Sequence, residues 1–148
     1  MKNFILCLAL FTACTSQQKD LSKQAGQEII KADKEMNDMA IKDGFHKTLL
    51  KFADDSLVKP QDGEFPVIGK QALEKYWSSK NETTAISWEP YKAEAAKSGE
   101  LGYTFGNWKY VGKDTTLYGN YYTFWKKQAD GAWKFVVDGG NNTPAPAK

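Results

Sequence analysis

Arginine is absent from the sequence: all 20 basic residues are lysine, and 18 acidic residues are interspersed among them. Bidentate contacts of a protein to guanine and to phosphate depend on the two-pronged guanidinium group of arginine, which the lysine ammonium does not reproduce. Lysines mixed with acidic residues are typical of a solvated surface, and the net charge is only +2. The composition therefore argues against a nucleic-acid partner.

Cysteine and histidine are almost as scarce. The chain contains two cysteines, Cys7 and Cys14, and one histidine, His46. Cys7 lies inside an apolar leader and Cys14 at its end, so we expect a mature domain without a free thiol. That excludes disulfides and thiolate catalysis. A site with several histidine ligands is excluded as well, and we expect neither a metal nor a cofactor.

The apolar run at the start of the chain is short. It extends from Phe4 to Phe11, well below the roughly 20 residues of a membrane-spanning helix. A basic start precedes it and the small residues Thr12 and Ala13 follow, which is the order of a signal peptide. Residues 10–14, LFTAC, resemble a bacterial lipobox, in which cleavage precedes a diacylated cysteine, although Phe11 stands where leucine is usual. The alternative is an ordinary signal peptide with Cys14 there by chance.

These features divide the chain into segments. Residues 1–13 are the predicted signal peptide, 14–24 the lipidated Cys14 with a polar tether, 25–142 the folded domain and 143–148 a flexible tail. A chain of 148 residues is expected to form one domain. A lipid on Cys14 would hold that domain in the cell envelope. Because no aspartate follows Cys14, the outer membrane is favoured over the inner membrane.

Hydrophobic spacing predicts helices followed by strands. Apolar residues recur at helical period in three segments and at period two from Ile86 onwards. This order indicates the α+β class. The expected helices cover residues 22–42, 45–53 and 70–79, and the expected strands cover residues 56–58, 65–68, 88–96, 101–110, 117–127 and 133–138, with a bulge near Gly106 and a loose segment from Gly139.

Short motifs follow one another along the domain: ADD at 53–55, GKQAL at 69–73, GELGYTFG at 99–106, GNY at 119–121 with Trp125, DGAWK at 130–134, and Asp138. In this order and spacing they resemble the SnoaL-like, ketosteroid-isomerase-like group of the nuclear-transport-factor-2-like superfamily, over roughly residues 27–142. The resemblance implies a cone-shaped, curved antiparallel sheet with three N-terminal helices closing a pocket. Most members of the nearest branch have unknown functions, so the resemblance predicts a fold more than an activity.

Enzymes of this superfamily place a carboxylate or a histidine inside the cone as general base, where burial raises the pKa of a carboxyl group. The resemblance places Asp138 near the cone, as a base or as a hydrogen-bond acceptor for a ligand. The alternative is a structural carboxylate at the end of the strand. His46 is the other catalytic candidate, or a surface histidine. The histidine–aspartate pair of the dehydratases is not found at matching positions, which argues against dehydration.

Aromatic residues make up 14% of the chain, more than a minimal core needs. We expect a pocket whose candidate residues are Trp77, Trp88, Tyr103, Asn107, Tyr121 and Trp125, although the aromatic rings could equally fill a core. The acidic side chains Asp33, Glu35, Asp38, Asp54 and Asp55 are expected to be solvated or to cap elements.

Three functions follow. The favoured one is a membrane-anchored lipoprotein whose domain binds a small apolar or aromatic molecule. The alternative is an enzyme of the isomerase, hydrolase or cyclase kind with Asp138 as base. The third is a structural or assembly role in which the open face of the sheet forms a homodimer.

Lipidation of Cys14 is directly testable. The intact mass of protein extracted from the membrane should correspond to a chain that begins at Cys14 and carries acyl groups. A free, unacylated N-terminus would contradict the prediction.

Overall fold

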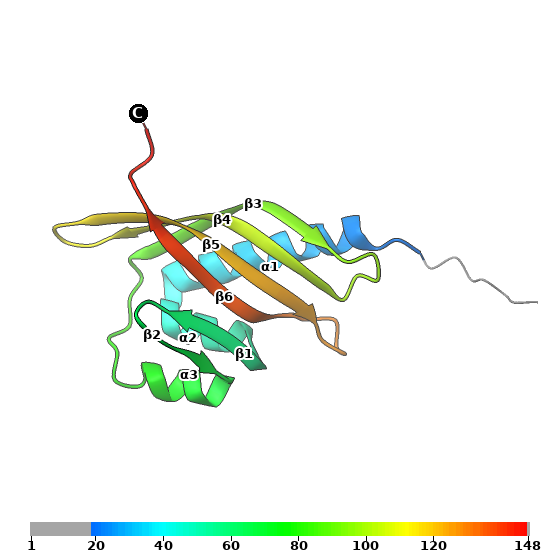
Figure 1. Cartoon of the computed structure of the whole chain (residues 1–148), viewed down its shortest axis with the longest axis horizontal. Helices are drawn as coiled ribbons and strands as arrows, with labels where there is room; N and C mark the ends of the chain where they lie inside the picture. Colours follow the sequence, from blue (N-terminus) through cyan, green and yellow to red (C-terminus); the bar gives the residue numbers. More distant parts are fainter. Residues whose placement is uncertain (1–18, 148) are drawn as a thin grey trace, which may run out of the picture.

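The computed structural model describes residues 19–147 and has the predicted α+β architecture (Figure 1). Cys14 lies outside the described residues. The elements in chain order are α1 (Ser22–Asp43), α2 (Phe45–Phe52), β1 (Ala53–Gln61), β2 (Glu64–Ile68), α3 (Lys70–Trp77), β3 (Ile86–Ala95), β4 (Leu101–Val111), β5 (Thr116–Lys127) and β6 (Trp133–Thr143).

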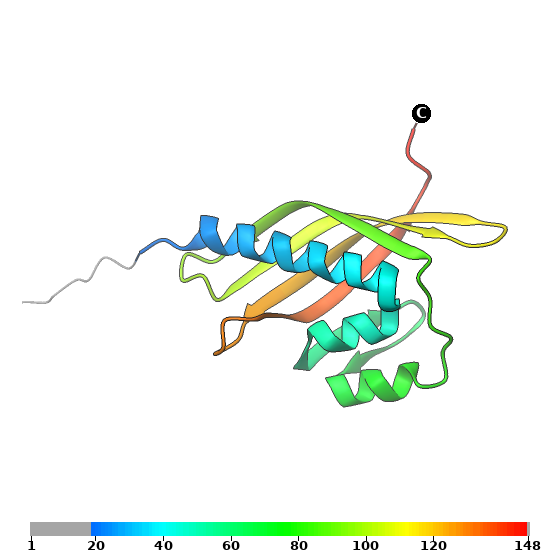
Figure 2. The same ribbon diagram turned by 180° about the vertical axis from the view of Figure 1, so that it is seen from behind.

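All six strands belong to one curved, unclosed sheet in the order β2-β1-β6-β5-β4-β3. Neighbouring strands are antiparallel except for β1 and β6, which are parallel. The helices lie on one face, which we call the inner face. Figure 2 shows α1 crossing this face over the long strands, while α2 and α3 lie beside β1 and β2.

Helix α1 packs on the sheet through a stripe of small and apolar residues. Ala25, Ile29, Met36 and Ala40 are buried and recur at helical spacing. Charged side chains occupy the opposite side of α1 and face solvent. The helix ends at Gly44, whose φ of 110° favours a residue without a Cβ. No helix among residues 19–147 is both long and apolar enough to cross a membrane.

The two faces of β4 show where side chains point. Gly102, Thr104 and Gly106 are buried on the inner face, whereas Tyr103 and Phe105 lie on the outer face.

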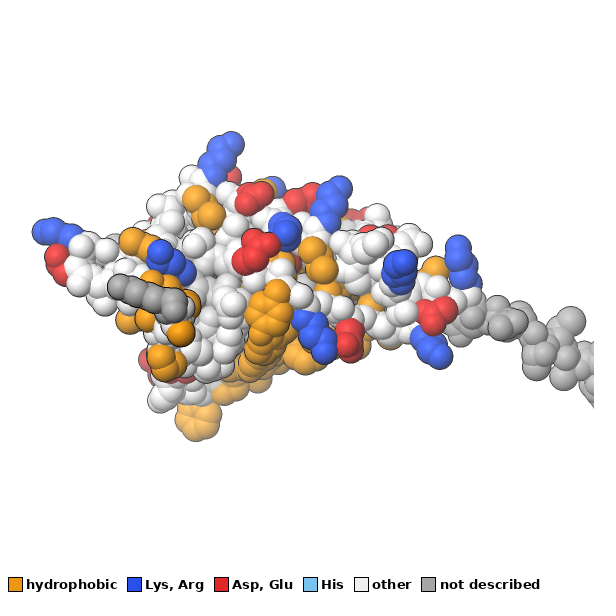
Figure 3. Space-filling view, turned by 90° about the horizontal axis from the view of Figure 1, so that it is seen from above, with side chains coloured by type: hydrophobic (Ala, Val, Ile, Leu, Met, Phe, Trp, Pro, Cys, Tyr) orange, Lys and Arg blue, Asp and Glu red, His pale blue; other side chains and the backbone are white. Residues whose placement is uncertain are grey.

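In Figure 3, which looks down from the β3 side, hydrophobic side chains gather along one flank of the molecule and many charged side chains along the opposite flank.

A bulge lies close to the predicted position but on the neighbouring strand. Strand β4 pairs with β5 without interruption, so the alternation through Gly106 continues unbroken. The irregularity is in β3, between Pro90 and Lys92, and it faces Gly106 and Phe105. The expected change of phase within β4 is therefore wrong.

A second bulge lies in β6 and controls the direction of Asp138. Phe135 pairs with Trp125 but Val137 pairs with Phe124, so Val136 is an extra residue in β6. Strict alternation from Phe135 would direct Asp138 to the outer face; the extra residue returns Asp138 to the inner face. The strand then continues to Thr143, and the prediction of a loose segment from Gly139 is wrong.

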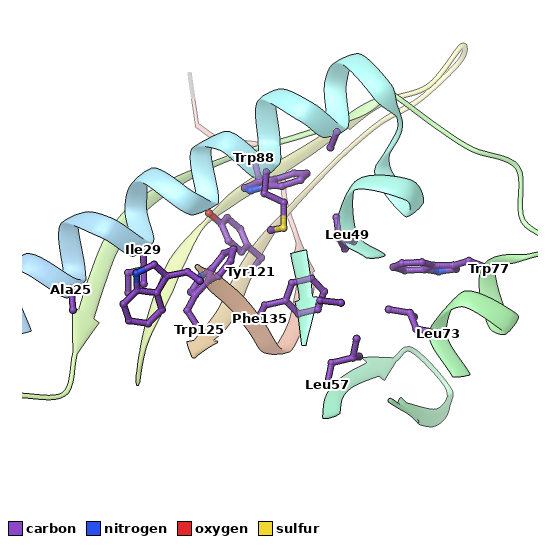
Figure 4. Packing of buried hydrophobic residues seen from close by; sticks show 14 residues of the cluster. Ala25, Ile29, Leu49, Leu57, Leu73, Trp77, Trp88, Tyr121, Trp125 and Phe135 are labelled. Atoms are coloured by element: carbon purple, nitrogen blue, oxygen red, sulfur yellow. The ribbon is translucent and has the colours of Figure 1, made fainter. Parts of the chain in front are cut away.

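The core fills the space between the helices and the inner face (Figure 4). Its completely buried large side chains come from both halves of the chain and include Ile29, Leu49, Leu57, Trp125 and Phe135. One close approach depends on Gly119, which lies directly opposite Trp108. A Cβ at Gly119 would overlap both the Trp108 indole and the carbonyl oxygen of Asn141.

Two glycine-to-alanine substitutions should therefore change the free energy of unfolding in opposite directions. Gly119→Ala should lower the free energy of unfolding by about 2 kcal/mol, because Trp108 and the backbone of β6 have to shift. Gly26→Ala should raise it by about 0.5–1 kcal/mol, since alanine is the better helix former and the nearest atom to its Cβ is 4.0 Å away. Urea unfolding followed by tryptophan fluorescence measures both; a stable Gly119→Ala would contradict the close packing.

Candidate functional site

A cavity of about 250 Å³ lies between the helices and the inner face of the sheet. Its apolar wall comes mainly from α1, α2 and β3, with Trp108 and Tyr121 on the neighbouring strands. Its polar side chains come mainly from β1 and β6. The apolar lining includes Met36, Phe45, Leu49, Ile86, Trp88, Trp108 and Tyr121, and the polar lining includes Lys59, Gln61, Thr123, Asp138, Asn141 and Asn142.

The aromatic wall is held by a buried carboxylate on α1. Asp33 is completely buried. Its Oδ1 accepts a hydrogen bond from Trp88 Nε1 at 2.6 Å, and its Oδ2 accepts one from the Tyr121 hydroxyl at 2.9 Å. Figure 4 shows the Tyr121 hydroxyl pointing towards α1. Both rings are thereby fixed in orientation where they line the cavity.

Thr104 extends this group of hydrogen bonds to a further strand. Its hydroxyl faces Asp33 and lowers the pKa of that carboxyl, and it accepts a hydrogen bond from Trp125 Nε1 at 2.9 Å. Burial raises the pKa of the Asp33 carboxyl to about 6, although the bonds from Thr104, Trp88 and Tyr121 act in the opposite direction. Burial and the adjacent Asp33 also raise the pKa of Tyr121, so its hydroxyl remains a donor.

Asp138 lies in the cavity wall, where both of its oxygens have partners. Oδ1 accepts a hydrogen bond from Thr123 at 2.9 Å, and Oδ2 forms an ion pair with Lys59 Nζ at 2.6 Å. Both side chains of the ion pair are largely buried, at 14% and 13% exposure. The ammonium group occupies a position from which a proton would otherwise reach Asp138, so the carboxylate is better arranged to fix Lys59 than to abstract a proton.

His46 is separate from the cavity lining. Its ring packs against Trp77 at an interplanar angle of 38° with 4.8 Å between ring centroids, and its Nδ1 lies 3.5 Å from Glu82. Burial lowers its pKa. The His46 ring contacts Phe45, which is itself a lining residue, but His46 is not in the lining that contains Asp138.

The predicted pocket residues divide into three groups. Trp88 and Tyr121 line the cavity together with Asp138. Trp77 and Trp125 are buried in the core outside the lining. Tyr103 and Asn107 lie on the outer face, where Tyr103 contacts Phe124 and Asn107 accepts a hydrogen bond from Asn120. Their assignment to the pocket is wrong because Tyr103 and Asn107 belong to the alternate residues of β4 whose side chains point away from the inner face.

The acidic side chains also include one correction. The expectation of a solvated or capping Asp33 is wrong, although Asp54 does bond the backbone and hydroxyl of Ser56 in a local turn. A signal for Asp33 exists in the sequence: it lies four residues after Ile29 and three before Met36, within the buried stripe of α1. No comparable signal identifies Lys59, Gln61 or Trp108, because their positions depend on strand register.

The chemistry of the lining suits binding more than metal or nucleophilic chemistry. Within residues 19–147, no three His, Cys, Asp or Glu side chains come close enough to share a metal ion. The lining offers aromatic faces, one lysine, one glutamine and carboxylate or amide oxygens. Such walls enclose a ring and hydrogen-bond its substituents.

Comparison with solved structures places the chain among proteins of the cone fold. A ketosteroid isomerase-like protein from Erwinia carotovora atroseptica shares 15% identity, with 80% of this chain and 95% of that chain covered and a TM-score of 0.64. A nuclear-transport-factor-2-like protein of unknown function from Shewanella oneidensis shares 15% identity, with coverages of 77% and 96% and a TM-score of 0.61.

An enzyme is also among the similar structures. It is an epoxide hydrolase/cyclase-like enzyme with a role in forming the pyran ring of the polyether salinomycin. The two proteins share 13% identity, with 82% of this chain and 92% of that chain covered and a TM-score of 0.54. No protein-family model and no curated protein sequence matches the chain. At such identities the likeness establishes the fold alone, and it confirms the predicted cone.

The raised pKa of Asp33 predicts a specific pH dependence. The folded protein binds the Asp33 proton more tightly than the unfolded chain, so the free energy of unfolding should fall as pH rises from about 4 to about 6. Asp33→Asn should remove this slope, which amounts to about 3 kcal/mol across the range. Chemical unfolding at a series of pH values measures it. Asp38→Asn, on the exposed side of α1, should keep the wild-type slope; an unchanged slope in Asp33→Asn would refute the assignment.

Proposed function

We propose that this domain binds a small apolar or aromatic molecule of one or two rings in the cavity. The observation that carries the proposal is the aromatic wall formed by Trp88, Trp108 and Tyr121. Two of these rings are held by the same buried carboxylate. A wall that is fixed before the ligand arrives loses little conformational freedom on binding, which favours affinity.

The volume of the cavity supports this class of ligand. An apolar cavity of about 150 Å³ can hold benzene, and drug-sized ligands occupy pockets of about 300–1,000 Å³. At about 250 Å³ the cavity suits a molecule between these limits, such as a substituted benzene or two fused rings.

Catalysis with Asp138 as general base is the second candidate. Its support is the position of Asp138 in the cavity wall and the likeness to a cyclase-like enzyme. The ion pair with Lys59 favours binding over catalysis, because the base would first have to lose its ammonium partner.

Attachment to the outer membrane through Cys14 belongs to the same proposal. Its support is the sequence alone: the short apolar leader, the small residues before Cys14 and the polar residues that follow. In that location the domain would take up ligand at the cell envelope rather than act on nucleic acid or on a second membrane.

Filling the cavity tests the binding proposal. Naphthalene titrated into the wild-type protein should bind, and Ile86→Trp should weaken binding at least tenfold because the indole occupies the cavity. Isothermal titration calorimetry measures both affinities.

The matched control is Ile41→Trp, which adds the same side chain at an exposed position on α1 and should bind naphthalene like wild type. Thermal unfolding of both variants separates a filled cavity from a misfolded chain. Equal affinity for naphthalene in wild type and a folded Ile86→Trp would overturn the proposed site, as would an absence of binding to wild type.

A further inference from the structure

The lining of the cavity carries both positively and negatively charged side chains. Its charged members are Lys59, Asp62 and Asp138. Asp138 neutralises Lys59 across 2.6 Å, and Asp62 adds a further carboxylate at the exposed turn between β1 and β2. The lining therefore has one more carboxylate than ammonium group, and an anionic ligand would meet a net negative wall.

Lys59 nevertheless retains a donor for a ligand. An ammonium group has three N–H donors. Two are directed at Asp138, to Oδ2 at 2.6 Å and to its carbonyl oxygen at 3.4 Å. The third has no acceptor among residues 19–147 and belongs to a side chain that lines the cavity.

Gln61 supplies a second donor, two residues further along β1. Its Nε2 is buried and has no hydrogen-bond partner among the described residues, while the side chain lines the cavity. A buried amide donor without an acceptor is unfavourable and uncommon. A ligand acceptor placed in the cavity would satisfy it.

We propose that the ligand is an uncharged planar molecule with a hydrogen-bond acceptor oxygen, which Lys59 Nζ and Gln61 Nε2 bind while the ring packs against Trp88, Trp108 and Tyr121. This inference rests on the proposed function and adds the chemical class of the ligand. Gln61 then selects between ligands of the same size, because only one with an acceptor pairs the buried donor.

Three probes of similar size test the class. These are 2-naphthamide, which is uncharged and has an acceptor oxygen, 2-naphthoate, which is its anionic counterpart, and 2-ethylnaphthalene, which has no acceptor. Isothermal titration calorimetry with the full chain should show wild type binding the amide about tenfold more tightly than either of the others, the range expected for one to two net hydrogen bonds.

Gln61→Leu isolates the second donor. It should bind 2-naphthamide five- to tenfold more weakly and 2-ethylnaphthalene with unchanged affinity. Because the substitution removes an unpaired buried donor, the free variant should be at least as stable to heat as wild type. Gln71→Leu makes the same substitution on the exposed side of α3 and should match wild type with all three probes.

The outcomes separate the two proposals. Equal affinity for 2-naphthamide and 2-ethylnaphthalene, with no effect of Gln61→Leu on either, would overturn the acceptor class while leaving an aromatic-binding cavity. Tighter binding of 2-naphthoate would overturn the uncharged class in the same way. Failure of all three probes to bind would overturn the proposed function itself.

Discussion

One carboxylate on α1 is hydrogen-bonded to side chains from two strands, Trp88 of β3 and Tyr121 of β5, and faces Thr104 of β4 between them. A carboxylate without water is costly unless donors surround it, so Asp33 can be buried only where these strands present their donors together. The helix is thereby fixed along the sheet as well as against it. Apolar contacts alone would permit sliding of α1, whereas directional bonds do not.

The cavity depends on this constraint and on an irregularity in β6. Asp33 orients two aromatic rings of the wall, and the extra residue Val136 turns Asp138 inward beside Thr123. Asp138 in turn holds Lys59 of β1. Elements from both ends of the domain therefore meet at the cavity, and each is positioned by a polar contact inside an otherwise apolar interior.

The helices, most strands and the cone could be predicted because periodicity and ordered motifs are properties of local sequence. Which face of β4 points into the core could not be predicted, since both faces carry aromatic residues: Tyr103 and Phe105 on one, Trp108 and Tyr110 on the other. Asp33 escaped prediction because carboxylates are ordinarily solvated and its bonding partners lie 55 and 88 residues away along the chain. The donors Lys59 and Gln61 depend likewise on pairing between distant strands.

The position of β6 in the sheet affects the order in which the protein folds. The last strand in the sequence lies inside the sheet, between β1 and β5, and its Asp138 is 79 residues from Lys59. Contacts between such distant segments form late, after the entropy of closing a long loop has been overcome. The pair of strands β1 and β2 therefore joins the rest of the sheet only when the C-terminal strand β6 has taken its place beside β1. The cavity is consequently among the last parts of the protein to be completed.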